Sequence, residues 1–360
     1  MASTDRPGLG PGVMSGDGFY DRNSATQDDA AAFGLALVAE AISGMPLSPD
    51  RRVVVADLGC AQGRNSLAPM RAAVTGFRAA GATDIDVIHT DLPNNDWATL
   101  FAVIEHDPDT YLIDEGIHPF VVGRSFYDRL FTPSTLHLAW TASALHWLSS
   151  PPQPLSDHFF AQSSTDAVAR EHYRSRSAAD WERFLAHRSV ELAPSGAVVF
   201  VDVCTDDQGS TGSQPLFECL QAALRGARDR GDLSDRDYAA TVYPSWFRTF
   251  SEWRAPFTPT YRGPSGAVLE LVSLTPTTMG DPFWPAYESN GNAEEYAASQ
   301  TGFLKAFLEP SFRSAWALSP DDCDRVIKDV FADTAHSIAE NPRNASPDHR
   351  LVTGLLRRIA

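Results

Sequence analysis

One short segment near residue 60 constrains the fold of this chain more than any other. Residues 53–56 read Val-Val-Val-Ala, a continuous apolar run that suits a strand buried on both faces of a parallel sheet. The turn DLGCAQG (57–63) follows, and apolar residues at helical spacing predict a helix over residues 66–80. Gly59 lets the chain turn tightly at the end of the strand. A strand, a glycine turn and a helix in this order indicate an α/β fold with a ligand site at the carboxyl end of the strand.

The same alternation continues along the chain. Further strands are predicted at 84–93, 120–126, 135–143, 197–204 and 267–276, and helices at 95–106 and 181–194. We therefore expect a doubly wound, mostly parallel sheet. The expected division is a disordered leader at 1–13, an α/β core formed by 14–204 plus 256–278, and an α-helical cap formed by 205–255 plus 279–360. Caps of this kind shape substrate pockets in open α/β folds.

Charge and composition exclude several classes of function. The chain has 29 basic and 46 acidic residues, a net charge of −17, which argues against nucleic acid and against anionic membranes as partners. It has no apolar run of about 18 residues, so no membrane-spanning helix is expected, and its first residues show no secretory signal. The four cysteines are scattered, which favours a reducing, cytoplasmic location.

The glycine turn and the next strand together predict a cofactor. The turn reads DxGxxxG rather than the dinucleotide pattern GxGxxG, and no P-loop lysine follows it. Asp91 ends the second strand, where its carboxylate is placed to accept hydrogen bonds from ribose hydroxyls. Asp57 lies at the first turn, near where an amino group would sit. The pair favours a nucleoside that carries an amino acid, S-adenosylmethionine; the alternative is a glycine turn in an α/β protein without a cofactor.

Seven blocks of sequence, in order along the chain, carry a family resemblance. They are MSGDGFYDRNSATQ (14–27), VADLGCAQGRNSL (55–67), TDLPNNDWATLF (90–101), GRSFYDRLFTPSTLHLAWTASALHWLS (123–149), FLAHRSVELAPSGAVVF (184–200), YPSWFRTF (243–250) and FLKAFLEPSF (303–312). The chain resembles the SABATH methyltransferases, a family named for salicylate, benzoate and theobromine enzymes. Its usage of Ala and Arg suggests a bacterial member. The resemblance implies a class I methyltransferase-like fold, S-adenosylmethionine as cofactor, S-adenosylhomocysteine as product, and a homodimer.

The resemblance also implies roles for individual residues. Asp91 would hold the ribose hydroxyls, Leu92 would lie beside the adenine, and the other cofactor residues would be Tyr20, Ser24, Cys60, Asn65, Ser125 and Phe126, with Asp57 and Gly59 added from the turn itself. Gln27 and Trp147 would hydrogen-bond the carboxylate of the acceptor, and His146 would line its pocket.

The chemistry of these side chains fits that assignment. A carboxylate is already ionised at neutral pH, so methyl transfer to it needs alignment and exclusion of water rather than a general base. The indole N–H of Trp147, the amide of Gln27 and a neutral His146 are donors that hold one carboxylate oxygen without neutralising the nucleophile. Two alternatives stay open: the His-Trp pair as an aromatic core cluster, and Gln27 as a surface residue. Cys60 is expected to be a small buried residue that lines the site rather than a reactive thiol.

Some positions depart from the family pattern. Ser143 stands where plant members carry a tyrosine over the substrate ring, which opens the pocket or changes its specificity. Further pocket walls are predicted from the aromatic residues of the cap, namely Trp246, Phe247 and Trp284. Asp235 and Asp237 lie where some members bind a divalent ion, but the Phe-Asn pair of those members is missing. No metal site is therefore predicted, and magnesium is doubtful.

The sequence thus predicts a carboxyl O-methyltransferase that converts a small aromatic acid to its methyl ester. One alternative is N-methylation of a xanthine-like heterocycle. Another is an idle member that binds a metabolite without turnover.

Overall fold

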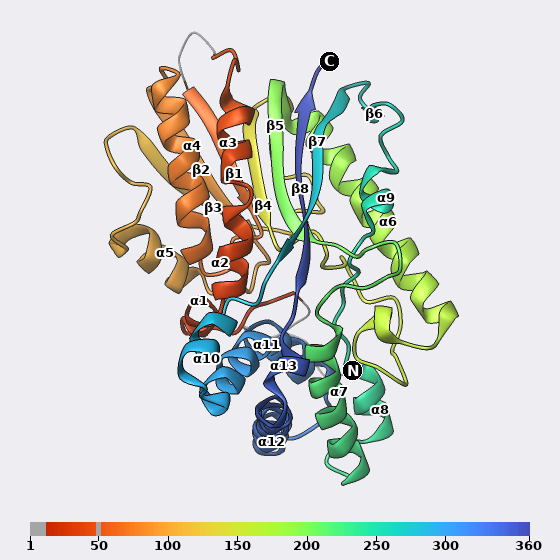
Figure 1. Ribbon diagram of the computed structural model, residues 1–360. Helices are drawn as coiled ribbons and strands as arrows, with labels where there is room; N and C mark the ends of the chain where they lie inside the picture. The colour runs from red at the N-terminus through yellow and green to blue at the C-terminus, as the bar shows by residue number, and fades with distance from the viewer. Residues whose placement is uncertain (1–11, 48–51) are drawn as a thin grey trace.

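The computed structural model describes residues 12–47 and 52–360 and is built on one eight-stranded sheet (Figure 1). The strand order is β3-β2-β1-β4-β5-β8-β7-β6. The bounds are β1 Arg52–Leu58, β2 Asp84–Asp91, β3 Ile117–Gly123, β4 Leu136–Ala142, β5 Leu192–Val203, β6 Tyr261–Arg262, β7 Val268–Met279 and β8 His349–Arg358. Strands β3, β2, β1, β4 and β5 pair in parallel, and β8, β7 and β6 pair antiparallel. The predicted doubly wound, mostly parallel sheet is confirmed.

Helices cover both faces of the sheet because its central strands are apolar on both faces. Val53 and Val55 of β1 pack against α3 (Leu35–Ile42) and α4 (Leu67–Ala79), together with α5 (Trp97–His106). Ala56 and Leu58 point the other way, toward α6 (Ala167–Glu191) and α9 (Phe250–Arg254). The period of two along a strand produces this division. Asp166 caps α6 by accepting hydrogen bonds from the backbone N–H groups of two residues in its first turn.

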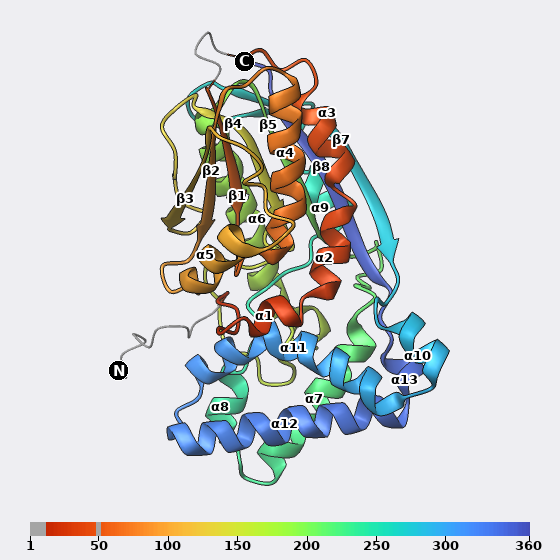
Figure 2. The ribbon, with the colours of Figure 1, turned by 90° about the vertical axis from the view of Figure 1, so that its left-hand side faces the viewer.

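The remaining helices gather at one end of the sheet, as both views show (Figures 1 and 2). They are α1 Phe19–Arg22, α7 Gln214–Asp229, α8 Asp235–Ala240, α10 Trp284–Asn290, α11 Ala293–Ala315, α12 Pro320–Glu340 and α13 Pro342–Ala345. The helix α2 Ala25–Ala32 instead lies beside the sheet, in contact with β4 and β5, and 3-10 turns lie at Arg64–Ser66 and Ala161–Ser163. α7, α11 and α12 share an apolar core of their own. This layer lies at the carboxyl ends of the parallel strands, where ligands of open α/β sheets bind. None of the helices in the described ranges is long and apolar enough to cross a bilayer.

The expected division of the chain is wrong at two places. The last part of the chain, assigned to the helical cap, forms β8, which lies between β5 and β7 in the sheet. Its apolar residues Leu351, Val352, Leu355 and Leu356 repeat at helical spacing, but the strand is buried on both faces and so does not alternate. At the other end, the predicted leader falls mostly on residues 1–11, outside the described residues, whereas Val13 is buried. Strand β8 therefore belongs to the α/β core, and the chain is already packed against the protein at Val13.

Candidate active site

A cavity of about 380 Å³ lies between the carboxyl ends of the strands and the helical cap. The loops that follow β1, β2, β3 and β4 contribute part of its wall. The ends of β5 and β7, the start of β8 and aromatic residues of the cap contribute further parts. Of the residues predicted from the sequence, the cavity brings together Tyr20, Gln27, Gly59, Asp91, Leu92, Ser125, Phe126, Ser143, His146, Trp147 and Phe247.

The turn after β1 is shaped for close approach of a ligand to the backbone. Gly59 has φ +86°, a left-handed conformation that favours glycine. A Cβ atom at this position would lie 2.8 Å from the Cβ of Ala144 and 3.4 Å from the ring of Phe126. Any larger residue at position 59 would therefore be strained and would fill the wall of the cavity.

Asp91 presents a fixed carboxylate to the same end of the cavity. Its Oδ2 accepts a hydrogen bond of 2.8 Å from the backbone N–H of Ala61, and its Oδ1 accepts one of 2.7 Å from Leu92. Withdrawal from bulk water raises the pKa of Asp91 to about 6, and the two backbone N–H groups oppose that rise. At neutral pH the group is ionised, with lone pairs left on both oxygens for hydroxyl donors.

This pKa predicts how cofactor affinity depends on pH. A ribose hydroxyl donates more strongly to a carboxylate than to a carboxylic acid. Affinity for S-adenosylhomocysteine should therefore be constant above pH 7 and fall as the pH drops below about 6. At low pH the affinity should fall by about tenfold for each pH unit. Calorimetric titration of the protein between pH 5 and pH 8 checks this.

Asp21 requires a control in that experiment, because burial also raises its pKa to about 6. The Asp91→Asn variant cannot titrate at position 91 and should bind the ligand weakly at every pH. A pH profile that keeps its full slope in Asp91→Asn would assign the titration to Asp21.

Three further residues predicted to bind the cofactor, Ser24, Cys60 and Asn65, lie outside the cavity wall. Ser24 and Asn65 hydrogen-bond each other, with 3.1 Å between Asn65 Nδ2 and Ser24 Oγ, and Asn65 also interacts with the hydroxyl of Tyr20. Cys60 is buried, and neither it nor Ser24 nor Asn65 lies in the cavity wall. Tyr20, the partner of Asn65, does line the cavity.

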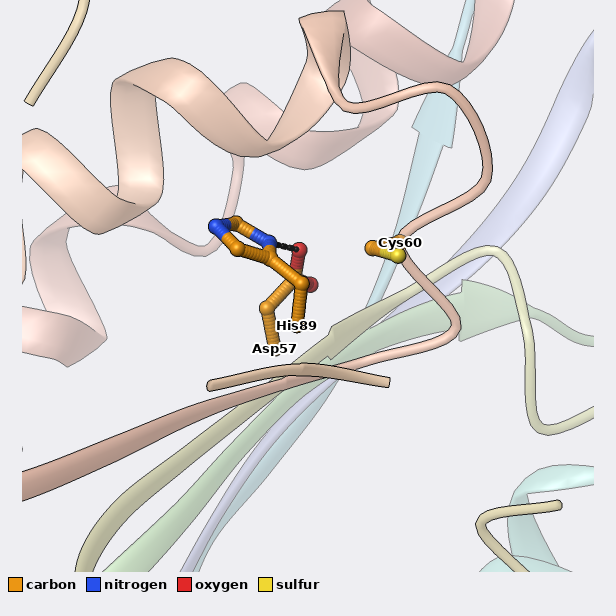
Figure 3. A group of neighbouring side chains, drawn as sticks. All are labelled: Asp57, Cys60 and His89. Atoms are coloured by element: carbon orange, nitrogen blue, oxygen red, sulfur yellow. Dashed lines mark hydrogen bonds and ion pairs between the residues drawn. The ribbon is translucent and has the colours of Figure 1, made fainter. Parts of the chain in front are cut away.

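Asp57 lies in a buried network instead of the cavity. Figure 3 shows its carboxylate joined to His89 on the neighbouring strand, with Asp57 Oδ2 2.9 Å from His89 Nδ1. The other ring nitrogen of His89 lies 2.9 Å from the hydroxyl of Tyr111. This placement does not support the predicted contact of Asp57 with the cofactor. Strand alternation turns the Asp57 side chain into the interface between the sheet and its helices.

The same network places Cys60 near Asp57 and His89, with candidate ligand atoms within 4.8 Å of one another (Figure 3). Both nitrogens of His89 already have partners, and burial raises the pKa of the Cys60 thiol well above its usual value. The group is therefore a satisfied buried network rather than an open metal site. Asp237 accepts hydrogen bonds from Ser234 and from the backbone of Ala317, so its carboxylate has a structural role.

In the loop after β4, His146 connects two residues that sequence reasoning missed. Its Nδ1 lies 2.6 Å from Oδ1 of the buried Asp202, and its Nε2 lies 2.8 Å from the hydroxyl of Tyr243. With Nδ1–H donating to the carboxylate, Nε2 accepts from the phenol, so neither nitrogen is free to hold a substrate. His146 lines the cavity as predicted, but as a residue that positions Tyr243.

Trp147 is held firmly and keeps its donor free. The hydroxyl of Tyr127 donates to its backbone carbonyl at 2.7 Å, and its indole ring packs edge-on against Tyr243 and Phe307 at 4.9 and 6.4 Å between centroids. Its indole N–H makes no hydrogen bond to the described part of the chain. Gln27 has a buried amide oxygen that likewise finds no partner there, and both residues line the cavity. The two side chains are therefore available to a ligand.

Two predicted pocket walls lie elsewhere. The segment 243–247 is locally extended, with bridges to Phe160 and Trp147, so its side chains alternate. Tyr243 and Phe247 face the cavity, while Trp246 points away and donates from Nε1 to Glu252. Trp284 packs against Tyr287 and Tyr296 in the cap and does not line the cavity. The alternation of this segment is the signal that would have found Tyr243.

Comparisons with known proteins agree with this geometry. The sequence model of a family described as SAM dependent carboxyl methyltransferase matches residues 12–256. Methyltransferase FUS9 of Gibberella moniliformis is 28% identical over 219 residues, which cover 59% of this chain and 58% of that protein. A salicylate/benzoate carboxyl methyltransferase of Arabidopsis thaliana is 30% identical over 202 residues, or 52% of this chain and 53% of that protein. The aligned segments thus span a little over half the length of these two relatives.

Among solved structures, a loganic acid methyltransferase with SAH has the same fold. It aligns with a TM-score of 0.78 at 19% identity, over 96% of this chain and 99% of that one. This confirms the predicted class I methyltransferase-like fold. The family model covers well over half of the chain and confirms the resemblance carried by the six sequence blocks between residues 14 and 250. The chain belongs to the family of S-adenosylmethionine-dependent carboxyl methyltransferases.

Proposed function

We propose that this protein transfers the methyl group of S-adenosylmethionine to the carboxylate of a small, largely apolar acid. The products are the methyl ester and S-adenosylhomocysteine. One observation carries the proposal: a single cavity joins an anionic part at Asp91 and Gly59 to a part with the free indole N–H of Trp147 and the amide of Gln27, whose buried oxygen has no partner in the described chain.

The cofactor end fits S-adenosylmethionine. Gly59 lines this part of the cavity, at a position where a Cβ atom would clash with Ala144, and the Asp91 carboxylate has lone pairs for two adjacent hydroxyl groups. Asp91 would hold the ribose, Leu92 and Phe126 would contact the base, and Tyr20 would close the wall. When bound, the cofactor supplies an electrophilic methyl group on a sulfonium.

At the acceptor end, the chain binds and orients a nucleophile that is already ionised. Trp147 N–H and the Gln27 amide would each donate to the carboxylate and fix which oxygen points toward the cofactor end. The hydrogen-bonded Asp202–His146–Tyr243 series keeps the wall beside Trp147 rigid. The apolar rings of Phe247, Phe303 and Phe307 exclude water that would compete with the acceptor. No residue is required to remove a proton.

Ser143 offers a test of the acceptor pocket. It lines the cavity in a left-handed conformation, φ +52°. Ser143→Tyr should fill part of the pocket and raise the KM of bulky acids about tenfold relative to small ones, since apolar pockets discriminate size to roughly this extent. Ser143→Asn is the matched control, because asparagine tolerates the same backbone conformation with a much smaller side chain. The same shift in both variants would place the effect in the backbone rather than in the pocket.

A methyl-transfer screen tests the proposed function. The purified protein would be mixed with methyl-labelled S-adenosylmethionine and separate panels of benzoates, cinnamates, indole acids, terpenoid acids, aliphatic acids and xanthines. Labelled product from one or more acids supports the proposal. Label transferred to xanthines alone, or to none of the panels while the cofactor binds, would contradict it.

A further inference from the structure

The cavity has a second polar position besides Trp147 and Gln27. His349 begins β8 and Ser213 precedes α7, and both line the cavity although both are at least 95% buried. Ser213 Oγ lies 3.1 Å from His349 Nδ1. The surrounding wall is apolar and includes Phe217, Met279 and Phe303.

This polar position comes from a different part of the fold than Trp147. Trp147 packs on Phe307, Phe307 packs on Phe303, and Phe303 packs on His349, with ring centroids 6.4, 5.1 and 6.1 Å apart. Phe307 and Phe303 thus form a series of ring contacts between the indole and the imidazole. Met279 and His349 are paired across β7 and β8, the antiparallel part of the sheet, whereas Trp147 follows the parallel strand β4.

The protonation of His349 determines what it offers. Burial lowers the pKa of His349 to about 4, so its ring is neutral at physiological pH. The Ser213 hydroxyl finds no acceptor other than Nδ1 among the described residues. When that hydroxyl donates to Nδ1, the ring proton lies on Nε2. Nε2 makes no hydrogen bond to the rest of the described chain, so its N–H is available to a ligand oxygen.

A purely structural pair would satisfy both nitrogens, as His89 and His146 do elsewhere in this protein. His349 differs from them because its second nitrogen is left without a partner in an apolar wall. An unpaired donor in such a place lowers affinity for ligands that cannot bond to it and favours those that can.

We propose that His349 Nε2 binds an oxygen at the end of the acceptor acid remote from its carboxyl group, with Ser213 fixing the orientation of the ring. The acceptor is then an elongated, mostly apolar acid with a hydroxyl or keto group at its far end. This inference rests on the proposed function, which places the carboxylate at Trp147.

The test uses pairs of acids that differ in the distal oxygen alone. The pairs are coumarate and cinnamate, hydroxyphenylhexanoate and phenylhexanoate, and terminally hydroxylated decanoate and decanoate, so that several lengths are covered. Binding to the full chain saturated with S-adenosylhomocysteine is measured by calorimetry, which needs no turnover. Methyl transfer to each acid is measured separately.

For at least one pair, the oxygenated acid should bind about tenfold more tightly. His349→Phe should remove that preference and keep the binding of the unsubstituted acid. Ser213→Ala should weaken the preference without changing the shape of the wall. His336→Phe is the matched control, because His336 is an exposed residue of α12 and should leave the preference intact. Thermal unfolding verifies that each variant is folded.

Equal binding within every pair, a preference that survives in His349→Phe, or no binding of any acid would overturn the inference. The outcomes for the proposed function are separate. A distal preference without methyl transfer to any acid would sustain the role of His349 and contradict the proposed function. Methyl transfer to an acid without a distal preference would support the proposed function and contradict the role of His349.

Discussion

The Asp91→Ala variant is expected to bind S-adenosylhomocysteine at least about 100-fold more weakly than the parent protein. Two ribose hydroxyls would lose a charged acceptor, and each hydrogen bond to a charged group contributes about 1.5–3 kcal/mol. A loss of about 3 kcal/mol or more corresponds to a change in Kd of at least about two orders of magnitude. Calorimetric titration with the product cofactor measures this directly.

Asp84→Ala is the matched control for that variant. Asp84 begins the same strand that Asp91 ends, and it lies outside the cavity wall. Asp91 also accepts from the backbone of Ala61 and Leu92, so thermal unfolding must show that the loop is intact in the variant. A folded Asp91→Ala protein with unchanged affinity would refute the assignment of the ribose to this carboxylate.

The Trp147→Phe variant is expected to lose between about 10-fold and 100-fold in kcat/KM for the acid, with unchanged cofactor affinity. The change removes one N–H donor to an ionised carboxylate, worth about 1.5–3 kcal/mol, and keeps most of the aromatic wall. Steady-state kinetics with the best acid from the screen, together with titration by S-adenosylhomocysteine, gives both quantities.

The Trp246→Phe variant is the matched control. It distinguishes the loss of the Trp147 N–H donor from the general effect of replacing a tryptophan. Trp246 directly precedes Phe247, which lines the cavity, but its N–H donates to Glu252 and its ring lies outside the cavity. It should leave kcat/KM nearly unchanged. If Trp147→Phe weakens cofactor and acid equally, or if Trp246→Phe is as damaging, then Trp147 has a structural role alone.

The parallel half of the sheet could be predicted from the sequence because its strands are long apolar runs followed by turns. The strand before Gly59 and the strand that ends in Asp91 were both placed correctly, and so was the α-helix between them, α4. The cavity residues of these turns followed from the fold, since carboxyl ends of parallel strands meet at one edge.

Strand β8 could not be predicted in the same way, because its neighbours in the sheet lie far away in the sequence. Its spacing of apolar residues resembles a helix, and Gly354, which would weaken a helix, is required by close contact with Phe200: a Cβ atom there would lie 2.1 Å from that ring. Strand β7 was predicted at 267–276, but β8, and with it His349, was hidden from sequence reasoning.

Side-chain direction limited the prediction of the site. Asp57 and Trp246 lie in the right segments, but strand alternation turns each of them away from the cavity. The partners of His146 come from β5 and from the segment after α8, more than fifty residues away along the chain. Long-range pairings of this kind leave no local pattern in the sequence.

The central claim is that this cavity makes a methyl ester, and identification of the product tests it most directly. An acid that accepts label in the screen is incubated with the protein and S-adenosylmethionine, and the product is analysed by mass and by its lability to mild base. We expect a base-labile methyl ester, formed in equal amount with S-adenosylhomocysteine. A base-stable product, methylated on nitrogen or on a hydroxyl oxygen, would contradict the account.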